Sequence, residues 1–94
     1  MYSVIRKYTF DPKSSQEIRD KIHDGFLPLV KKAPGFISYC WLDTGSGSGA
    51  SVGTFQAKAG ADESVRLAAD FVKENLAHLL SKPEITEGEV TINS

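Results

Sequence analysis

Hydrophobic and polar residues alternate along the first segment of the chain, residues 2–10. Successive side chains of a β-strand point to opposite faces, so the even-numbered residues of this segment would share one face. These are Tyr2, Val4, Arg6, Tyr8 and Phe10. The segment is rich in β-branched and aromatic residues, which strands favour. We therefore expect a strand over residues 2–10, ended by Pro12 because proline brings no N–H group to a sheet.

The next segment has the periodicity of an amphipathic helix. Its apolar residues recur at intervals of three and four, at Ile18, Ile22, Phe26, Leu29 and Val30. Ser14 and Glu17 have the spacing of a capping box at the helix start. Pro34-Gly35 ends the helix. Because Pro28 cannot donate a hydrogen bond to residue 24, we expect a kink or a break there.

Two further strands are predicted around a run of glycine and serine. Residues 36–43 carry apolar side chains on both faces, which indicates that both faces are covered, and Cys40 is expected to be a small buried residue. The run Gly45-Ser46-Gly47-Ser48-Gly49 leads into a strand over residues 50–57. Its spacing resembles a phosphate-binding loop, but such loops open a helix. We interpret the run as a hairpin connection.

The last part of the chain predicts a helix and a strand. The helix begins at Ala61 or Asp62 and ends before Pro83, with a core stripe of Val65, Ala69, Val72, Leu76 and Leu79. Residues 87–93 form the final strand. The order βαββαβ is that of an α+β, ferredoxin-like fold, a four-stranded antiparallel sheet with two helices on one face. The whole chain, residues 1–94, is predicted to be a single domain.

Composition narrows the possible partners. Net charge is −1 with interleaved acidic and basic residues, so no patch for nucleic acid or an anionic membrane is expected. The lone Cys40 and the lack of a signal-peptide pattern after Met1 favour the cytoplasm. Two helices can cover only one side of the sheet, and the other side would expose an apolar patch. We therefore expect a homodimer formed through that sheet face.

Aromatic residues dominate the predicted strands and have two compatible interpretations. They can form the sheet core and a dimer face, or part of the set can line an apolar cavity between sheet and helices. In the second case, orientation or proton transfer would fall to Arg6, Tyr8 and His78. The candidate substrate contacts are Tyr39, Trp41, Phe55, Phe71 and Asn75. Neither His23 nor His78 has partners at metal-ligand spacing, so no metal site is expected.

Three segments carry a resemblance to a known family. They are Tyr2 to Arg6, Gly25 to Val30 leading into Pro34-Gly35-Phe36, and Ser64 to Ala77 before Glu87 to Val90. On these segments, over nearly its whole length, the chain resembles small stand-alone antibiotic biosynthesis monooxygenase domains of the dimeric α/β-barrel superfamily. The resemblance implies two sheets packed face to face as a homodimeric barrel, with the helices outside and a pocket in each subunit. Relatives oxidise aromatic polyketides or quinols without metal or flavin, cleave heme, or isomerise lactones.

The heme-cleaving branch of that family fits poorly. It uses an Asn on the first strand, a Trp on the third and a His late in the second helix. Here the first strand offers Arg6 and Tyr8, Phe55 stands near the Trp position, and His78 could match the His. Two hypotheses remain, both without a cofactor. One is a cofactor-independent oxygenase of a small aromatic or quinol, and the other is a non-catalytic dimer that binds a small hydrophobic ligand.

Overall fold

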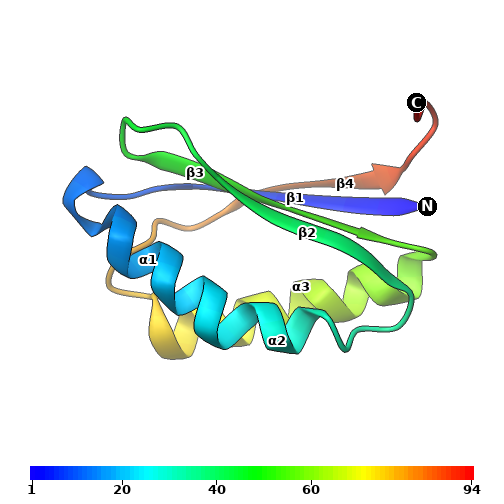
Figure 1. Cartoon of the computed structure of the whole chain (residues 1–94), viewed down its shortest axis with the longest axis horizontal. Helices are drawn as coiled ribbons and strands as arrows, with labels where there is room; N and C mark the ends of the chain where they lie inside the picture. The colour runs from blue at the N-terminus through cyan, green and yellow to red at the C-terminus, as the bar shows by residue number, and fades with distance from the viewer.

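A four-stranded antiparallel sheet organises the protein, in a computed structural model that describes residues 1–94 (Figure 1). The strand order is β2-β3-β1-β4, so β1 pairs with both β3 and β4. The strands are β1 (Tyr2–Thr9), β2 (Phe36–Asp43), β3 (Ser48–Phe55) and β4 (Glu84–Glu89). The predicted ferredoxin-like α+β fold is confirmed.

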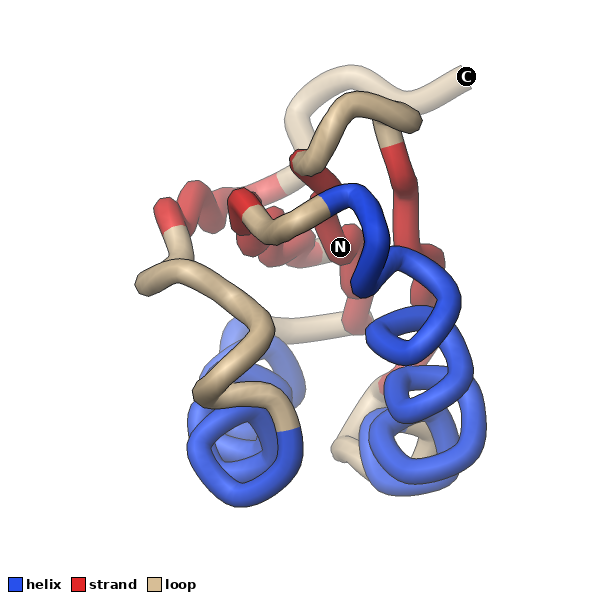
Figure 2. The backbone as a smooth tube through the Cα atoms, turned by 90° about the vertical axis from the view of Figure 1, so that its left-hand side faces the viewer, coloured by secondary structure: helices blue, strands red, loops and turns tan.

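The helices lie side by side on one face of this sheet, and the other face has no helix over it (Figures 1 and 2). The first helical region comprises a short 3₁₀ turn η1 (Pro12–Ser14), α1 (Ser15–Lys21), a π-helix η2 (Ile22–Phe26) and α2 (Leu27–Val30). The second helix is α3 (Lys58–Asn75). The core lies between the helices and the inner face of the sheet. None of the helices is long and apolar enough to cross a membrane.

The break predicted in the first helix is a π-helix. Four buried residues of this region are spaced by four, namely Ile18, Ile22, Phe26 and Val30. In a regular α-helix each step of four residues overshoots a full turn by about 40°, so three steps would turn Val30 about 120° away from Ile18. The π-helix η2 has more residues per turn, so it compensates for this rotation and keeps the four residues on one side. Its hydrogen bond runs from the Leu27 N–H to the carbonyl of Ile22. Pro28 contributes because it has no N–H for the residue 24 carbonyl.

Two details of this region differ from prediction. Ser14 has helical backbone angles and makes no capping hydrogen bond, so the predicted capping box is wrong. Asp11 caps instead, by accepting from the Lys13 N–H at 2.9 Å at the start of η1. Leu29 is exposed rather than part of the core stripe, because that stripe follows the spacing of four.

The predicted stripe of α3 is wrong at one of its five positions. Ala69 is exposed and Ala68 is buried in its place, whereas Leu76 is buried and Val65, Val72 and Leu79 pack against the core. The helix begins at Lys58 and ends at Asn75. Small residues form its buried side: Gly60, Ala61, Ser64 and Ala68. They allow close approach to the sheet and to the loop before β2, where a Cβ on Gly60 would lie 1.9 Å from the Pro34 carbonyl oxygen. A hydrophobic pattern built on valine and leucine does not detect such a surface.

A β-bulge between Phe36 and Ser38 changes the faces of β2. It places Phe36 on the inner side, with its ring centroid 6.1 Å from that of Phe55. Tyr39 and Trp41 also pack against the core, whereas Cys40 is exposed on the open face. The expectation of a buried Cys40 is therefore wrong, because the open face has no cover in the single chain.

The remaining two strands begin earlier than predicted. β3 starts at Ser48, two residues before the predicted start, and β4 occupies residues 84–89 rather than 87–93. The glycine run forms the connection between β2 and β3, as expected. Gly47 has a φ of 87°, and a Cβ there would lie 2.8 Å from the Phe10 carbonyl oxygen. The Gly47 carbonyl also accepts from the Phe10 N–H at 2.9 Å, so this turn is tied to the end of β1.

Candidate active site

Small residues on the inner face of β3 leave space at the centre of the sheet. Gly49, Ser51 and Gly53 alternate along this face and are all buried. A Cβ on Gly49 would lie 2.7 Å from the Trp41 ring, and a Cβ on Gly53 would lie 3.8 Å from the Tyr39 ring. The Trp41 ring therefore lies over the β3 backbone at Gly49, where a larger side chain would exclude it, and the Tyr39 ring lies beside Gly53 at ordinary contact distance.

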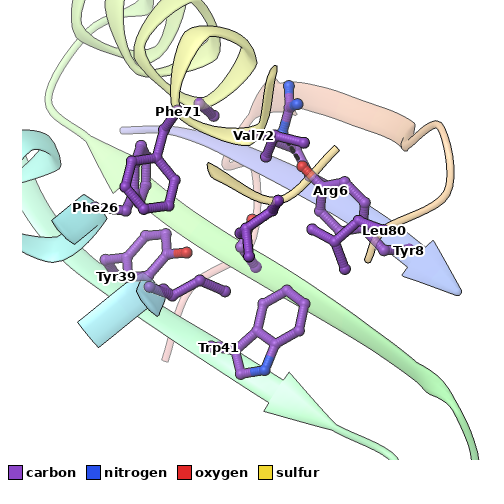
Figure 3. A pocket seen from close by; sticks show the side chains of 12 residues that line it. Arg6, Tyr8, Phe26, Tyr39, Trp41, Phe71, Val72 and Leu80 are labelled. Carbon is purple, nitrogen blue, oxygen red and sulfur yellow. Dashed lines mark hydrogen bonds between the residues drawn. The ribbon is translucent and has the colours of Figure 1, made fainter. Parts of the chain in front are cut away.

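A cavity lies in this space between sheet and helices (Figure 3). Strand residues of its wall include Arg6 and Tyr8 from β1, Tyr39 and Trp41 from β2, and Ser51 from β3. The helical side and the segment after α3 complete the lining with Ile22, Phe26, Ala68, Phe71, Val72, Leu76 and Leu80. Most of these side chains are apolar. The few polar groups among them would therefore bind the polar atoms of a ligand and set its orientation.

Arg6 and Tyr8 form the main polar contact of the cavity. The Arg6 Nε donates to the Tyr8 hydroxyl oxygen at 2.9 Å, drawn as a dashed line in Figure 3. The guanidinium carbon also lies 5.8 Å from the centre of the Tyr8 ring, within the range of a cation–π interaction. Both side chains are buried. Because Tyr8 accepts this bond through its oxygen, its own hydroxyl proton is available to a ligand.

Tyr39 and Trp41 provide further polar groups from β2. Burial raises the pKa of Tyr39 well above its ordinary value, and the nearby Ser51 hydroxyl opposes this shift. Tyr39 is thus a neutral phenol at physiological pH and can donate a proton in a hydrogen bond. The Trp41 Nε1–H is buried and has no hydrogen-bond partner. An unpaired buried donor is costly, so this group is a candidate for ligand contact.

The cavity is very small in this structure. Its volume is about 20 Å³, which is room for about one water molecule. A second cavity of about 20 Å³ lies beside it and shares Arg6, Phe26, Tyr39, Ser51 and Ala68 as lining. Ligand pockets typically have volumes of ~300–1,000 Å³. A ligand would therefore have to displace side chains of this shared wall and join the two spaces.

Phe71 separates the cavity from the surface. It lines the cavity on one side, and on the other it lines an open hollow of about 310 Å³ together with Gly25 and Asn75. Its ring centroid lies 5.6 Å from that of Phe26. The side chain of Phe71 thus lies between the cavity and the hollow, and its displacement would connect them.

The structure brings together some of the predicted site residues and not others. Arg6, Tyr8, Tyr39, Trp41 and Phe71 line the first cavity, and Phe55 lines the second. Two predicted residues lie elsewhere. His78 is exposed in the turn after α3 and lines neither cavity, because the helix that was expected to carry it ends at Asn75. Asn75 is exposed and donates to the Phe71 carbonyl at 3.1 Å.

Other lining residues were not identified from the sequence. Ser51 stands in an alternation of small residues, Gly49-x-Ser51-x-Gly53, that signals close approach to a strand. Leu80 reaches the cavity because the chain turns after α3, with the Leu80 N–H donating to the Leu76 carbonyl at 3.0 Å. No group of three or more His, Cys, Asp or Glu side chains is placed to hold a metal ion. No His, Asp or Glu lines either cavity.

No family model and no curated protein matches the chain. Solved structures do match. A protein of unknown function from Nitrosomonas europaea, NE2512, is 22% identical with a TM-score of 0.81, over 99% of this chain and 91% of that one. A dimeric ferredoxin-like protein from an uncultured marine organism is 12% identical with a TM-score of 0.75, over 99% and 96%.

Oxygenases are also among the matching structures. SnoaB, a cofactor-independent oxygenase from Streptomyces nogalater, is 10% identical with a TM-score of 0.71, over 98% of this chain and 94% of that one. An antibiotic biosynthesis monooxygenase shares the fold with a TM-score of 0.73. The resemblance predicted from the sequence is confirmed at the level of the fold. At these identities the shared fold does not assign an activity.

Proposed function

We propose that the protein is a cofactor-independent oxygenase of a small aromatic compound such as a quinol or an anthrone. The observation that supports this most is the aromatic cavity between sheet and helices, which presents Tyr8, Tyr39 and the Trp41 Nε1–H among apolar walls. The fold shared with SnoaB, a cofactor-independent oxygenase, adds support.

In such a reaction the substrate supplies all the electrons. For an anthrone, a ring CH₂ group and O₂ give a ring carbonyl and one molecule of water. The protein has to orient the ring, exclude water and stabilise charge that develops on the substrate oxygen. The apolar lining would exclude water. The neutral Tyr39 phenol and the hydroxyl proton of Tyr8 can donate to the substrate oxygen.

The same cavity also fits a second function, a non-catalytic protein that binds a small hydrophobic ligand. This alternative is favoured by the lack of a His, Asp or Glu in the lining, because these side chains are the common proton acceptors in active sites. An oxygenase with this lining would depend on a substrate that loses a proton readily, from a hydroxyl group of a quinol or from the CH₂ group of an anthrone.

Oxygen consumption distinguishes the two functions. Purified protein is supplied with a panel of quinols and anthrones in an oxygen electrode, with binding measured by quenching of Trp41, the only tryptophan. We expect Tyr8→Phe to lower the oxygen uptake by ~100-fold, the lower range for loss of an acid–base group. The exposed His78→Ala variant should retain full uptake. Binding of the panel without any oxygen uptake would support the binding protein and refute the oxygenase.

We further propose that two copies pair through the open face of the sheet. Its central row across the strands is Cys40, Val52, Ile5 and Thr86, all uncharged. Leu42 in the neighbouring row is an exposed large apolar residue. Such a surface is typical of protein contacts, and the fold is shared with a dimeric ferredoxin-like protein. The location in the cytoplasm stays a prediction.

A further inference from the structure

Arg6 is a buried cation without an anionic partner. Only 5% of its surface is exposed. All the ion pairs of the structure involve other residues, so no carboxylate pairs with this guanidinium. Arginine cannot lose its proton in a protein, so it cannot become neutral as a buried lysine can. The two terminal nitrogens nevertheless keep contact with solvent, because neither is a fully buried atom without a hydrogen-bond partner. The guanidinium therefore lies at the boundary between the cavity and solvent, with a cation–π contact to Tyr8.

The hydrogen bonds of Arg6 leave its terminal nitrogens unused. The single bond recorded for the side chain runs from Nε to the Tyr8 hydroxyl. The two terminal NH₂ groups donate to no protein acceptor. Together they form the planar fork that matches the two oxygens of a carboxylate.

The cavity as a whole also has more unused donors than acceptors. Besides Arg6, the Trp41 Nε1–H has no partner and the Tyr8 hydroxyl proton is available. No carboxylate lines the cavity to balance them. A ligand that satisfies these groups must be rich in acceptor oxygens. One guanidinium among apolar walls matches a monoanion with an apolar body better than a phosphate, which usually needs several cations or backbone N–H groups.

We infer that the ligand of this cavity is an aromatic carboxylate, with its carboxylate group held by Arg6. This inference rests on the proposal that the cavity binds a small aromatic molecule, and it adds the chemical group that selects the ligand. The aromatic ring would occupy the space near Tyr39, Trp41 and Phe26, where rings already pack against one another. Figure 3 shows the Arg6 side chain on the opposite side of the cavity from Tyr39 and Trp41.

Two probes of equal size test the inference. Benzoate and benzamide differ in charge and hardly in shape, and isothermal titration calorimetry measures their binding to the wild-type protein at pH 7. We expect benzoate to bind about tenfold more tightly, because hydrogen bonds to a charged group are about 1.4 kcal/mol stronger. Equal affinity for the two probes, or no binding of benzoate at millimolar concentration, would overturn the inference.

Two variants localise the effect. Arg6→Met replaces the guanidinium by an apolar chain of similar length and should abolish the preference for benzoate. Lys7→Met removes the same charge from the neighbouring residue, which is exposed on the open face, and should keep the preference. Circular dichroism checks that both variants are folded. A preference that survives in folded Arg6→Met would contradict the role of Arg6.

The result of the benzoate test can be distinguished from the result of the oxygen uptake test. Oxidation of a neutral quinol together with equal binding of benzoate and benzamide would refute the carboxylate site alone. A preference for benzoate without oxygen uptake by any quinol or anthrone, including derivatives that carry a carboxylate group, would support the carboxylate site and refute the oxygenase.

Discussion

The ring of Phe71 lies against the backbone of Gly25, where a Cβ atom would be only 2.6 Å from Phe71 Cε1. Gly25 belongs to the π-helix η2 and Phe71 to α3, so the two helical regions meet at this contact. π-helical turns are frequent at functional sites. The contact holds the Phe71 side chain in the position where it separates the cavity from the outer hollow.

Removal of this ring should open the cavity to solvent. We expect Phe71→Ala to increase the quenching of Trp41 fluorescence by acrylamide, because Trp41 lines the same cavity. Val65→Ala is the matched control, since Val65 also lies on α3 and packs on the core but lines neither cavity. Equal quenching in the two variants would show that Phe71 does not close the cavity.

Dimerisation should depend on the centre of the open face. Wild-type protein is expected to have twice the chain mass of 10.2 kDa by light scattering at micromolar concentration. Val52→Lys should yield monomers, because two lysines would be buried at the interface without partners. Leu29→Lys places the same charge on an exposed position of α2 and should remain dimeric. A monomeric wild-type protein would refute the pairing.

Leu76 should contribute strongly to stability. Its side chain is fully buried just after α3 and lines the cavity. We expect Leu76→Ala to lower the free energy of unfolding by ~2–5 kcal/mol. Lys73→Ala, one turn earlier and exposed, should change it by less than about 0.5 kcal/mol. Denaturation with urea measures both, and a small effect at Leu76 would contradict its burial.

Tyr39 should make the protein sensitive to strong alkali. Its pKa is raised above the ordinary value of 10.0 by burial, so above pH 10 the unfolded chain loses this proton while the folded chain keeps it. Stability from this group is therefore complete below pH 10 and falls as the pH rises further. Tyr39→Phe removes this contribution, so urea unfolding measured from pH 9 to 11 should show a shallower loss than in the wild type. An identical slope in both proteins would contradict the shift.

The sequence was sufficient to predict a strand or a helix where large apolar side chains recur at the spacing typical of that element. Alternation in residues 2–10 predicted β1 to within one residue, and the recurring Ile18, Ile22, Phe26 and Val30 predicted the buried side of the first helix. The order of these elements then predicted the fold. Arg6, Tyr8, Tyr39 and Trp41 were predicted as site residues, and the structure places all four around one cavity.

The sequence was insufficient where small residues or an irregularity decide the geometry. The fully buried residues of α3 are glycine, alanine and serine, so a stripe built on the larger Val65 and Val72, which pack at the edge of the core, missed Ser64 and Ala68. The bulge near Ile37 places Phe36 on the inner face, which strict alternation cannot anticipate. His78 was expected to extend the pattern of a helix that ends three residues earlier.

The π-helix has a consequence for changes in chain length. Deleting one residue within Ile22–Phe26 would allow a regular α-helix to form there. Ile18 and Val30 would then be eleven residues apart, which leaves a rotation of only about 20° between them in a regular helix, so both would stay on the buried side. The segment thus behaves as one residue inserted into an otherwise regular helix. What the deletion would change is the wide turn itself, where Gly25 lies against Phe71, so the wall of the cavity depends on the length of this segment as well as on its composition.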